Sequence, residues 1–160
     1  LGRVHRAKSE RDAAMRAFGE ALNTGASTAY GAEAALRLGE LLTECGKYDE
    51  AQERLNEAAT RSAAPELLGL RAHAYAGLAR NAALKGDGEA ALRYYMSVGI
   101  LFDDPVLVPE ALSKAAALLD KLGRGEEAKA MREELRNRYP DSPLAKPVQE
   151  QAAPERKAQT

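Results

Sequence analysis

The side chains best suited to catalysis or metal binding are few in this sequence and far apart. The chain has two histidines, His5 and His73, and one cysteine, Cys45. A metal site needs several histidine, cysteine or carboxylate ligands that converge, and a nucleophile needs an adjacent base. The sequence has no glycine-rich phosphate loop after a strand and no Ser-His-Asp or Cys-His signature. We therefore predict no catalytic, metal or cofactor site, and we interpret His73 as a solvated residue rather than a ligand or base.

The remaining reactive or charged motifs have structural interpretations. We interpret the paired glutamates, Glu126-Glu127 and Glu133-Glu134, as solvated helix faces. We interpret Asp103-Asp104 as a turn and helix cap. A single cysteine cannot form an internal disulfide, so cysteine usage does not distinguish an oxidising from a reducing compartment. We expect Cys45 to be a small residue near the end of a packed helix rather than a reactive thiol.

Composition favours a helical protein and disfavours two classes of partner. Of the 160 residues, 45% are hydrophobic, with much alanine and no Trp, which favours close helix packing over a thick core. The 23 basic and 24 acidic residues give a net charge of -1, whereas nucleic-acid binding usually needs a clustered basic face. No apolar run approaches the ~18 residues that a membrane helix needs. We expect no nucleic-acid partner and no direct membrane insertion.

One stretch, residues 35–59, has the pattern of two helices joined by a tight turn. Apolar residues at 35, 38, 41 and 42, and then at 48, 51, 55, 58 and 59, follow the spacing of helical faces. Gly46 lies where a helix C-cap favours positive φ, and Asp49 lies in the first turn of the next helix, where carboxylates are favoured. Gly39 and Ala51 are small enough to let two antiparallel helices approach closely.

The same pattern recurs along the chain. The alanines at 14, 51, 91 and 128 are 37, 40 and 37 residues apart, and glycines at 46, 86 and 123 each precede one of them by five residues. Self-similarity of this kind predicts a solenoid.

The spacing of the best copy resembles a tetratricopeptide (TPR) repeat, through Ala35, Leu38-Gly39, Leu42, Ala51, Leu55 and Ala58. Ala35 and Leu42 replace the two aromatic residues of the family pattern, so the copy is degenerate. The resemblance implies an all-α fold, a right-handed α-α superhelix of about three full repeats plus a truncated first repeat. The expected repeats are residues 1–26, 28–64, 66–104 and 106–139, with 140–160 as a disordered polar tail.

Two parts of this division carry further expectations. In the first repeat, Leu1-Gly2 is expected to be the middle of a first helix and Glu10 to Asn23 the second helix, so that the chain is a fragment of a larger bacterial protein. The run from Val98 to Val108 is unusually apolar. It is either buried between the third and fourth repeats or exposed as a contact patch.

The family resemblance also implies a binding groove, because TPR proteins bind extended peptides or partner helices in the concave surface lined by their first helices. The corresponding positions are Arg3, Arg6, Glu33, Leu36, Glu40, Thr43, His73, Ala76, Arg80, Ala83, Glu110, Ser113, Ala117 and Asp120. The Lys and Asn positions of the family's chaperone-type carboxylate clamp hold other residues, so an acidic chaperone tail is not expected. Arg80 beside Glu40 is either an inter-repeat ion pair or a partner contact.

These observations favour a non-enzymatic protein-protein interaction scaffold that binds a protein or peptide partner and needs no cofactor. The alternative is a structural spacer or self-association module without a peptide ligand, which includes a possible homodimer. The junction from Arg138 to Pro143 resembles those of bacterial cell-envelope TPR proteins of the Tol-Pal-associated type. This similarity favours a periplasmic or cell-envelope location over a cytoplasmic one.

Overall fold

The structure, a computed structural model, describes residues 2–24 and 29–146, with the side chains of the first range described from residue 10 onward. These residues form seven α-helices and two short 3-10 helices, and no strand. The expected all-α class is confirmed. The elements are α1 (Gly2–Thr24), α2 (Ala29–Glu44), α3 (Tyr48–Arg61), η1 (Pro65–Leu67), α4 (Leu68–Lys85), α5 (Gly88–Leu101), α6 (Leu107–Lys121), α7 (Gly125–Arg138) and η2 (Pro143–Ala145).

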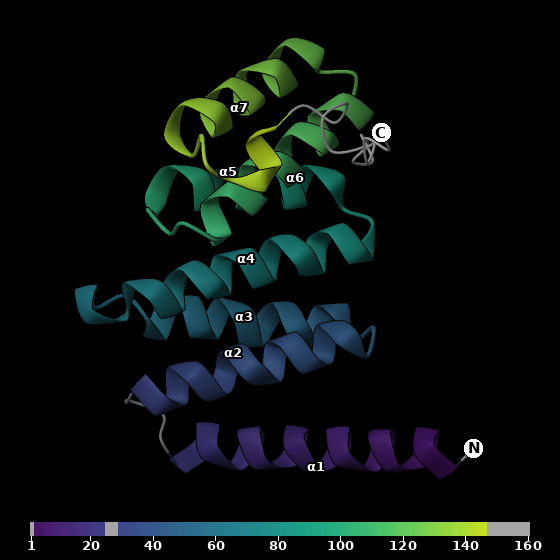
Figure 1. Cartoon of the computed structure of the whole chain (residues 1–160). Coiled ribbons are helices and arrows are strands. Elements are labelled where there is room, and N and C mark those ends of the chain that lie inside the picture. The colour runs from purple at the N-terminus through teal and green to yellow at the C-terminus, as the bar shows by residue number, and fades with distance from the viewer. Residues whose placement is uncertain (1, 25–28, 147–160) are drawn as a thin grey trace, which may run out of the picture.

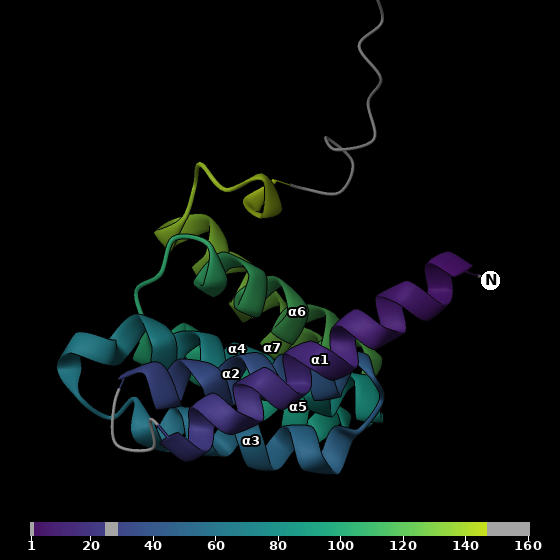
Figure 2. The same ribbon diagram turned by 90° about the horizontal axis from the view of Figure 1, so that it is seen from below.

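The helices are stacked in the order of the sequence, from α1 at one end to α7 at the other (Figure 1). Each α-helix packs against its neighbours in sequence, and α4 also packs against α2 and α6. Seen from below, α1 crosses the helices behind it (Figure 2). The stack therefore brings α2, α4 and α6 side by side, although their residues are far apart in the chain.

A glycine turn joins the two helices within each of the pairs α2/α3, α4/α5 and α6/α7. Gly46, Gly86 and Gly123 have φ values of 74°, 92° and 74°, a region that side chains disfavour. The residue after each glycine donates its N–H to the carbonyl five residues earlier, over 2.8 to 2.9 Å. This is the Schellman arrangement that closes a helix C-terminus. The three turns expected from the sequence are confirmed.

Small residues allow the helix backbones to approach closely. The alanines that follow these turns, Ala51, Ala91 and Ala128, are fully buried. Leu55 of α3 is also fully buried, and its side chain lies against two glycines. A Cβ atom on Gly39 would lie 2.6 Å from Leu55 Cγ, and one on Gly77 would lie 2.8 Å from Leu55 Cδ2. The expected role of Gly39 is confirmed, since no real Cβ fits at such a distance.

The N-terminal expectation is wrong in one respect. Residues 2–24 form a single helix, α1, instead of the end of one helix followed by a second from residue 10. No glycine or proline lies between Gly2 and Gly19, so nothing in this stretch interrupts a helix. Leu1 lies outside the described residues.

The predicted boundary at residue 139 is also wrong. The segment after α7 folds back as η2, which packs against α6 and α7. Ala145 is only 8% exposed and belongs to the hydrophobic core formed by α4 to α7. The Ser142 side chain caps η2 by accepting the Leu144 N–H over 3.3 Å. Packed structure therefore reaches at least residue 145. Residues 147–160 of the predicted tail lie outside the described part of the chain.

The apolar run between Val98 and Val108 was expected to be either buried or exposed as a contact patch, and the structure contains both kinds of position. Val98, Phe102 and Val108 are buried, whereas Ile100 and Val106 are 74% and 70% exposed. The run is thus partly core and partly surface.

The prediction for Asp104 is confirmed, whereas that for Cys45 is only partly correct. The Asp104 side chain accepts the backbone N–H groups of Val106 and Leu107 over 2.8 and 2.7 Å, which confirms the expected helix cap. Cys45 lies directly after α2, as expected, but is exposed rather than packed. None of the described helices is long and apolar enough to cross a membrane.

Candidate functional site

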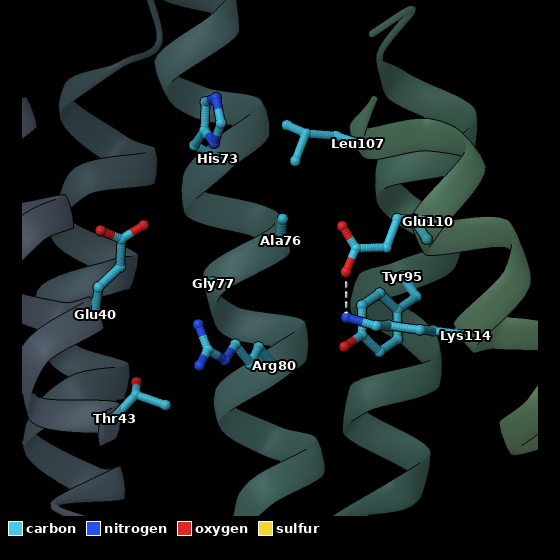
Figure 3. A pocket seen from close by; sticks show the side chains of 11 residues that line it. Glu40, Thr43, His73, Ala76, Gly77, Arg80, Tyr95, Leu107, Glu110 and Lys114 are labelled. Atoms are coloured by element: carbon cyan, nitrogen blue, oxygen red, sulfur yellow. Dashed lines mark hydrogen bonds and ion pairs between the residues drawn. The ribbon is translucent and has the colours of Figure 1, made fainter. Parts of the chain in front are cut away.

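A cavity of about 170 Å³ lies on the side of the stack where α2, α4 and α6 meet, with Tyr95 contributed by α5 (Figure 3). Its walls carry charged side chains and its centre carries small ones. The lining residues are Glu40, Thr43, His73, Ala76, Gly77, Arg80, Tyr95, Leu107, Glu110, Ala111 and Lys114.

Several of the predicted groove positions come together in this cavity. Glu40 and Thr43 come from α2, His73 and Arg80 from α4, and Glu110 from α6. Positions 73, 76, 77 and 80 share one face of α4 because a helix repeats every 3.6 residues. In Figure 3, Glu40 and Glu110 lie on opposite sides of this face. The cavity therefore joins positions that the sequence separates by as many as 70 residues, from 40 to 110.

The charged groups of the cavity are unequally paired. Glu110 forms an ion pair with Lys114 at 2.5 Å, and Glu40 pairs with Arg37 on its own helix at 3.0 Å. Arg80 is exposed and forms no ion pair with a described residue, Glu40 included. The first alternative for Arg80, an ion pair with Glu40, is therefore absent from the structure. The second alternative, a contact with a partner, stays a prediction. The Arg80 guanidinium therefore has no carboxylate partner among the described residues.

Tyr95 supplies the aromatic wall of the cavity. The residue is 6% exposed, and Lys114 Nζ lies 5.7 Å from the centre of its ring. Burial raises the pKa of the Tyr95 hydroxyl above its ordinary value, and the nearby charge of Lys114 offsets part of that effect. The hydroxyl is therefore protonated at neutral pH.

A buried polar network supports the α2 wall. Thr43 is 4% exposed, and its hydroxyl lies 2.9 Å from the carbonyl oxygen of Gly39 and 3.0 Å from Asn81 Oδ1. The Asn81 side chain in turn donates to the carbonyl oxygen of Tyr48 over 2.9 Å. Asn81 is 1% exposed, so these contacts satisfy an amide that would otherwise be buried without partners. Through this network, one side chain of α4 holds the end of α2 and the start of α3.

Other predicted groove residues lie elsewhere. Leu36 is 1% exposed and belongs to the core formed by α1 to α4, so its assignment to the groove is wrong. Glu33 is on the surface of α2 and lies 3.8 Å from Arg37. Ser113 lines an adjacent, mainly apolar groove with Val106 and Leu144, which shares only Glu110 and Lys114 with the cavity. The side chains of Arg3 and Arg6 lie outside the described residues.

Six residues that complete the site were not predicted from the sequence. The cavity is also lined by Gly77, Tyr95, Leu107, Ala111 and Lys114, and Asn81 supports it. For Lys114 a signal was present, since it follows Glu110 by one helical turn and Glu–Lys pairs at this spacing attract each other. Within the side chains that the structure describes, no three His, Cys, Asp or Glu residues are grouped closely enough to hold a metal ion.

No protein-family model matches this chain. A search of curated proteins likewise finds no match. The interpretation of the cavity therefore depends on its own residues.

Proposed function

We propose that this protein is a TPR-type interaction module that binds a peptide or partner helix across α2, α4 and α6. In this proposal the pairs α2/α3, α4/α5 and α6/α7 are three repeats of a right-handed superhelix within a larger protein. The recurrent glycine turns and the buried alanines five residues after them support the repeat assignment. So does the additional packing of α4 against α2 and α6.

The observation that carries the proposal is the convergence of Glu40, His73, Arg80 and Glu110 in one cavity. They come from three successive first helices of the proposed repeats. The cavity surface between them contains Ala76 and Gly77, whose small size lets a ligand backbone approach α4. Residues with these positions suit recognition of an extended chain rather than a reaction, so we propose a binding role and no enzymatic one.

Arg80 is the residue from which ligand preference follows most directly. Its guanidinium has no ion pair with a described residue, while the carboxylates of Glu40 and Glu110 are paired with Arg37 and Lys114. A guanidinium that meets a carboxylate forms short, charge-assisted hydrogen bonds. The proposed ligand therefore places one Asp or Glu side chain at Arg80.

The test is a selection of binding peptides from a random library on the wild-type protein, followed by fluorescence anisotropy with the selected peptides. We expect an acidic residue to recur in the selected sequences and Arg80→Glu to raise the Kd at least about tenfold, since a charge-assisted contact is replaced by repulsion. Arg93→Glu is the matched control, because Arg93 is exposed on α5 and does not line the cavity. Equal effects of the two charge reversals, or none from either, contradict the proposal.

The exposed apolar residues Ile100, Leu101 and Val106 favour a second candidate function, self-association without a peptide ligand. They are 74%, 56% and 70% exposed and lie close together in sequence around the α5–α6 connection. Sedimentation equilibrium distinguishes this candidate. A mass that rises with concentration, and returns to that of a monomer in Ile100→Lys, supports it, whereas a constant monomer mass excludes it.

A further inference from the structure

The face of α4 opposite the groove lines a second cavity. Arg71, Tyr75 and Leu78 are four and then three residues apart, so they share a face that is turned about half a revolution from His73, Ala76 and Arg80. The cavity has a volume of about 150 Å³ and lies between α3, α4 and α5. Its lining residues are Asn56, Ala59, Thr60, Arg71, Tyr75, Leu78 and Tyr94.

This cavity contains a cation without an anion. Arg71 is the one charged residue in the lining, and it forms no ion pair with a described residue. Its Nε atom is buried and has no hydrogen-bond partner. Arg71 as a whole is half-buried, but its Nε–H group has lost water without gaining a hydrogen bond, which is unfavourable.

Glu57, which follows Asn56 on α3 and does not line the cavity, already has two cationic partners. Glu57 accepts hydrogen bonds from Arg54 at 2.6 Å and from Arg61 at 2.5 Å. Arg71 instead lies near the Tyr75 ring, 6.0 Å from its centre, which is the outer limit of a cation–π contact. The protein thus leaves the charge of Arg71 only weakly compensated.

The other polar groups in the lining are neutral, and the Asn56 amide and the Tyr94 hydroxyl are able to donate. The Thr60 hydroxyl already donates to the backbone carbonyl oxygen of Asn56 over 2.9 Å. Asn56 and Thr60 are exposed on α3, and Tyr94 packs edge-on against Tyr75 with ring centres 6.4 Å apart. Side-chain amides and hydroxyls donate hydrogen bonds to oxygen atoms. A guanidinium is the side chain best shaped to hold a carboxylate or phosphate through two parallel hydrogen bonds.

We propose that the Arg71 cavity is a binding site for a small oxyanion, a phosphate or a carboxylate group, with Asn56 and Tyr94 as additional donors. The site is separate from the proposed peptide groove, since it lies on the other face of α4. The two sources of such a group, a free inorganic ion and a carboxylate, are distinguished by the probes below.

The experiment titrates the protein with sodium phosphate and, separately, with sodium acetate, while sodium chloride keeps the ionic strength constant. Binding is followed through the Nε–Hε resonance of Arg71 in two-dimensional NMR and through calorimetry. We expect a saturable shift of that resonance with one probe or both, and Arg71→Met to weaken binding at least about tenfold. Arg93→Met is the matched control and leaves the affinity unchanged.

The resonance of the wild-type protein decides the question even if Arg71→Met does not fold. No saturable shift with either probe overturns the proposal, as does a folded Arg71→Met that binds as tightly as the wild type. Arg80→Glu separates this site from the peptide groove. It is expected to lose peptide binding and keep oxyanion binding, so each proposal can fail without the other.

Discussion

Replacing Asn81 with Asp tests how far the packing of α2, α3 and α4 depends on one buried amide. The two side chains have the same shape, so Asn81→Asp creates no cavity. It replaces the Nδ2 donor, 2.9 Å from the Tyr48 carbonyl oxygen, with an acceptor. It also places a carboxylate at a position that is 1% exposed. At neutral pH the new oxygen faces the Tyr48 oxygen with no hydrogen between them.

The size of the effect follows from the burial of that charge. A buried charge left without its partner costs about 3–5 kcal/mol, a large share of the 5–15 kcal/mol by which domains are usually stable. Asn81→Ala, which removes the two hydrogen bonds of the amide and leaves a small cavity but buries no charge, is expected to cost about 1–3 kcal/mol. The charge, and not the missing donor, is therefore the larger part of the effect of Asn81→Asp.

The effect should depend on pH in a fixed direction. Burial raises the pKa of the introduced carboxyl in the folded state above its unfolded value of about 3.9. The unfolded state then binds fewer protons than the folded state between the two pKa values, so the variant loses stability as pH rises through that window. The loss is at most about 1.4 kcal/mol per pH unit. Near pH 4 the carboxyl is protonated when folded, and its hydroxyl is able to donate to the Tyr48 oxygen.

Urea unfolding measures this pH dependence directly. The quantity to compare is the free energy of unfolding of the variant minus that of the wild type, at pH 7 and near pH 4. The difference should be large at pH 7 and should shrink at the lower pH. Asn137→Asp is the control, because Asn137 is exposed on α7, and surface substitutions usually change stability by about 0.5 kcal/mol or less. A difference that is the same at both pH values, or no larger than that of Asn137→Asp, would refute the reasoning.

Two further predictions concern packing and titration. Gly39→Ala is expected to lower the free energy of unfolding by about 1–3 kcal/mol, because its Cβ would lie 2.6 Å from Leu55 Cγ. Gly69→Ala, which meets nothing within 4 Å, should be neutral or stabilising by up to about 1 kcal/mol in the same chemical denaturation series. Burial of Tyr95 raises its pKa, so stability should fall as pH rises above the unfolded tyrosine value of about 10. Tyr95→Phe should reduce that alkaline loss, and an unchanged slope of stability against pH would show that Tyr95 titrates normally.

The helix pairs were predictable because their signals are local. A glycine at the end of a helix and apolar residues at helical spacing act over one or two turns, and Gly46, Gly86 and Gly123 all have the expected positive φ. The errors arose where helix boundaries were taken from the alignment with the TPR pattern, here called the family register, instead of from the local helix propensity of the residues. That register placed a break near residue 10, although the stretch contains no helix-breaking residue.

The site was less predictable because burial depends on distant partners. The same register placed Leu36 in the groove, but the leucine is 1% exposed in a core that also contains Leu55 and Leu78. Asn81 gave no sign of its role, since its partner Thr43 is 38 residues away. A polar residue on a helix is usually solvated, and only the packed structure shows that this one joins three helices.

The absence of a side chain at Gly77 affects the fold and the cavity together. Gly77 lines the proposed groove, and the position of its missing Cβ is occupied to within 2.8 Å by Leu55 Cδ2. The missing Cβ of Gly77 therefore allows the close approach of α3 and α4 directly beside the cavity. A larger residue at 77 would displace Leu55 and disturb both the helix packing and the cavity. Arg80 and Arg71, by contrast, extend from opposite faces of α4 without ion pairs to described residues. A substitution of the exposed Arg80 is therefore expected to leave the packing of α4 unchanged, whereas a substitution of Arg71 removes a side chain whose Nε atom is buried.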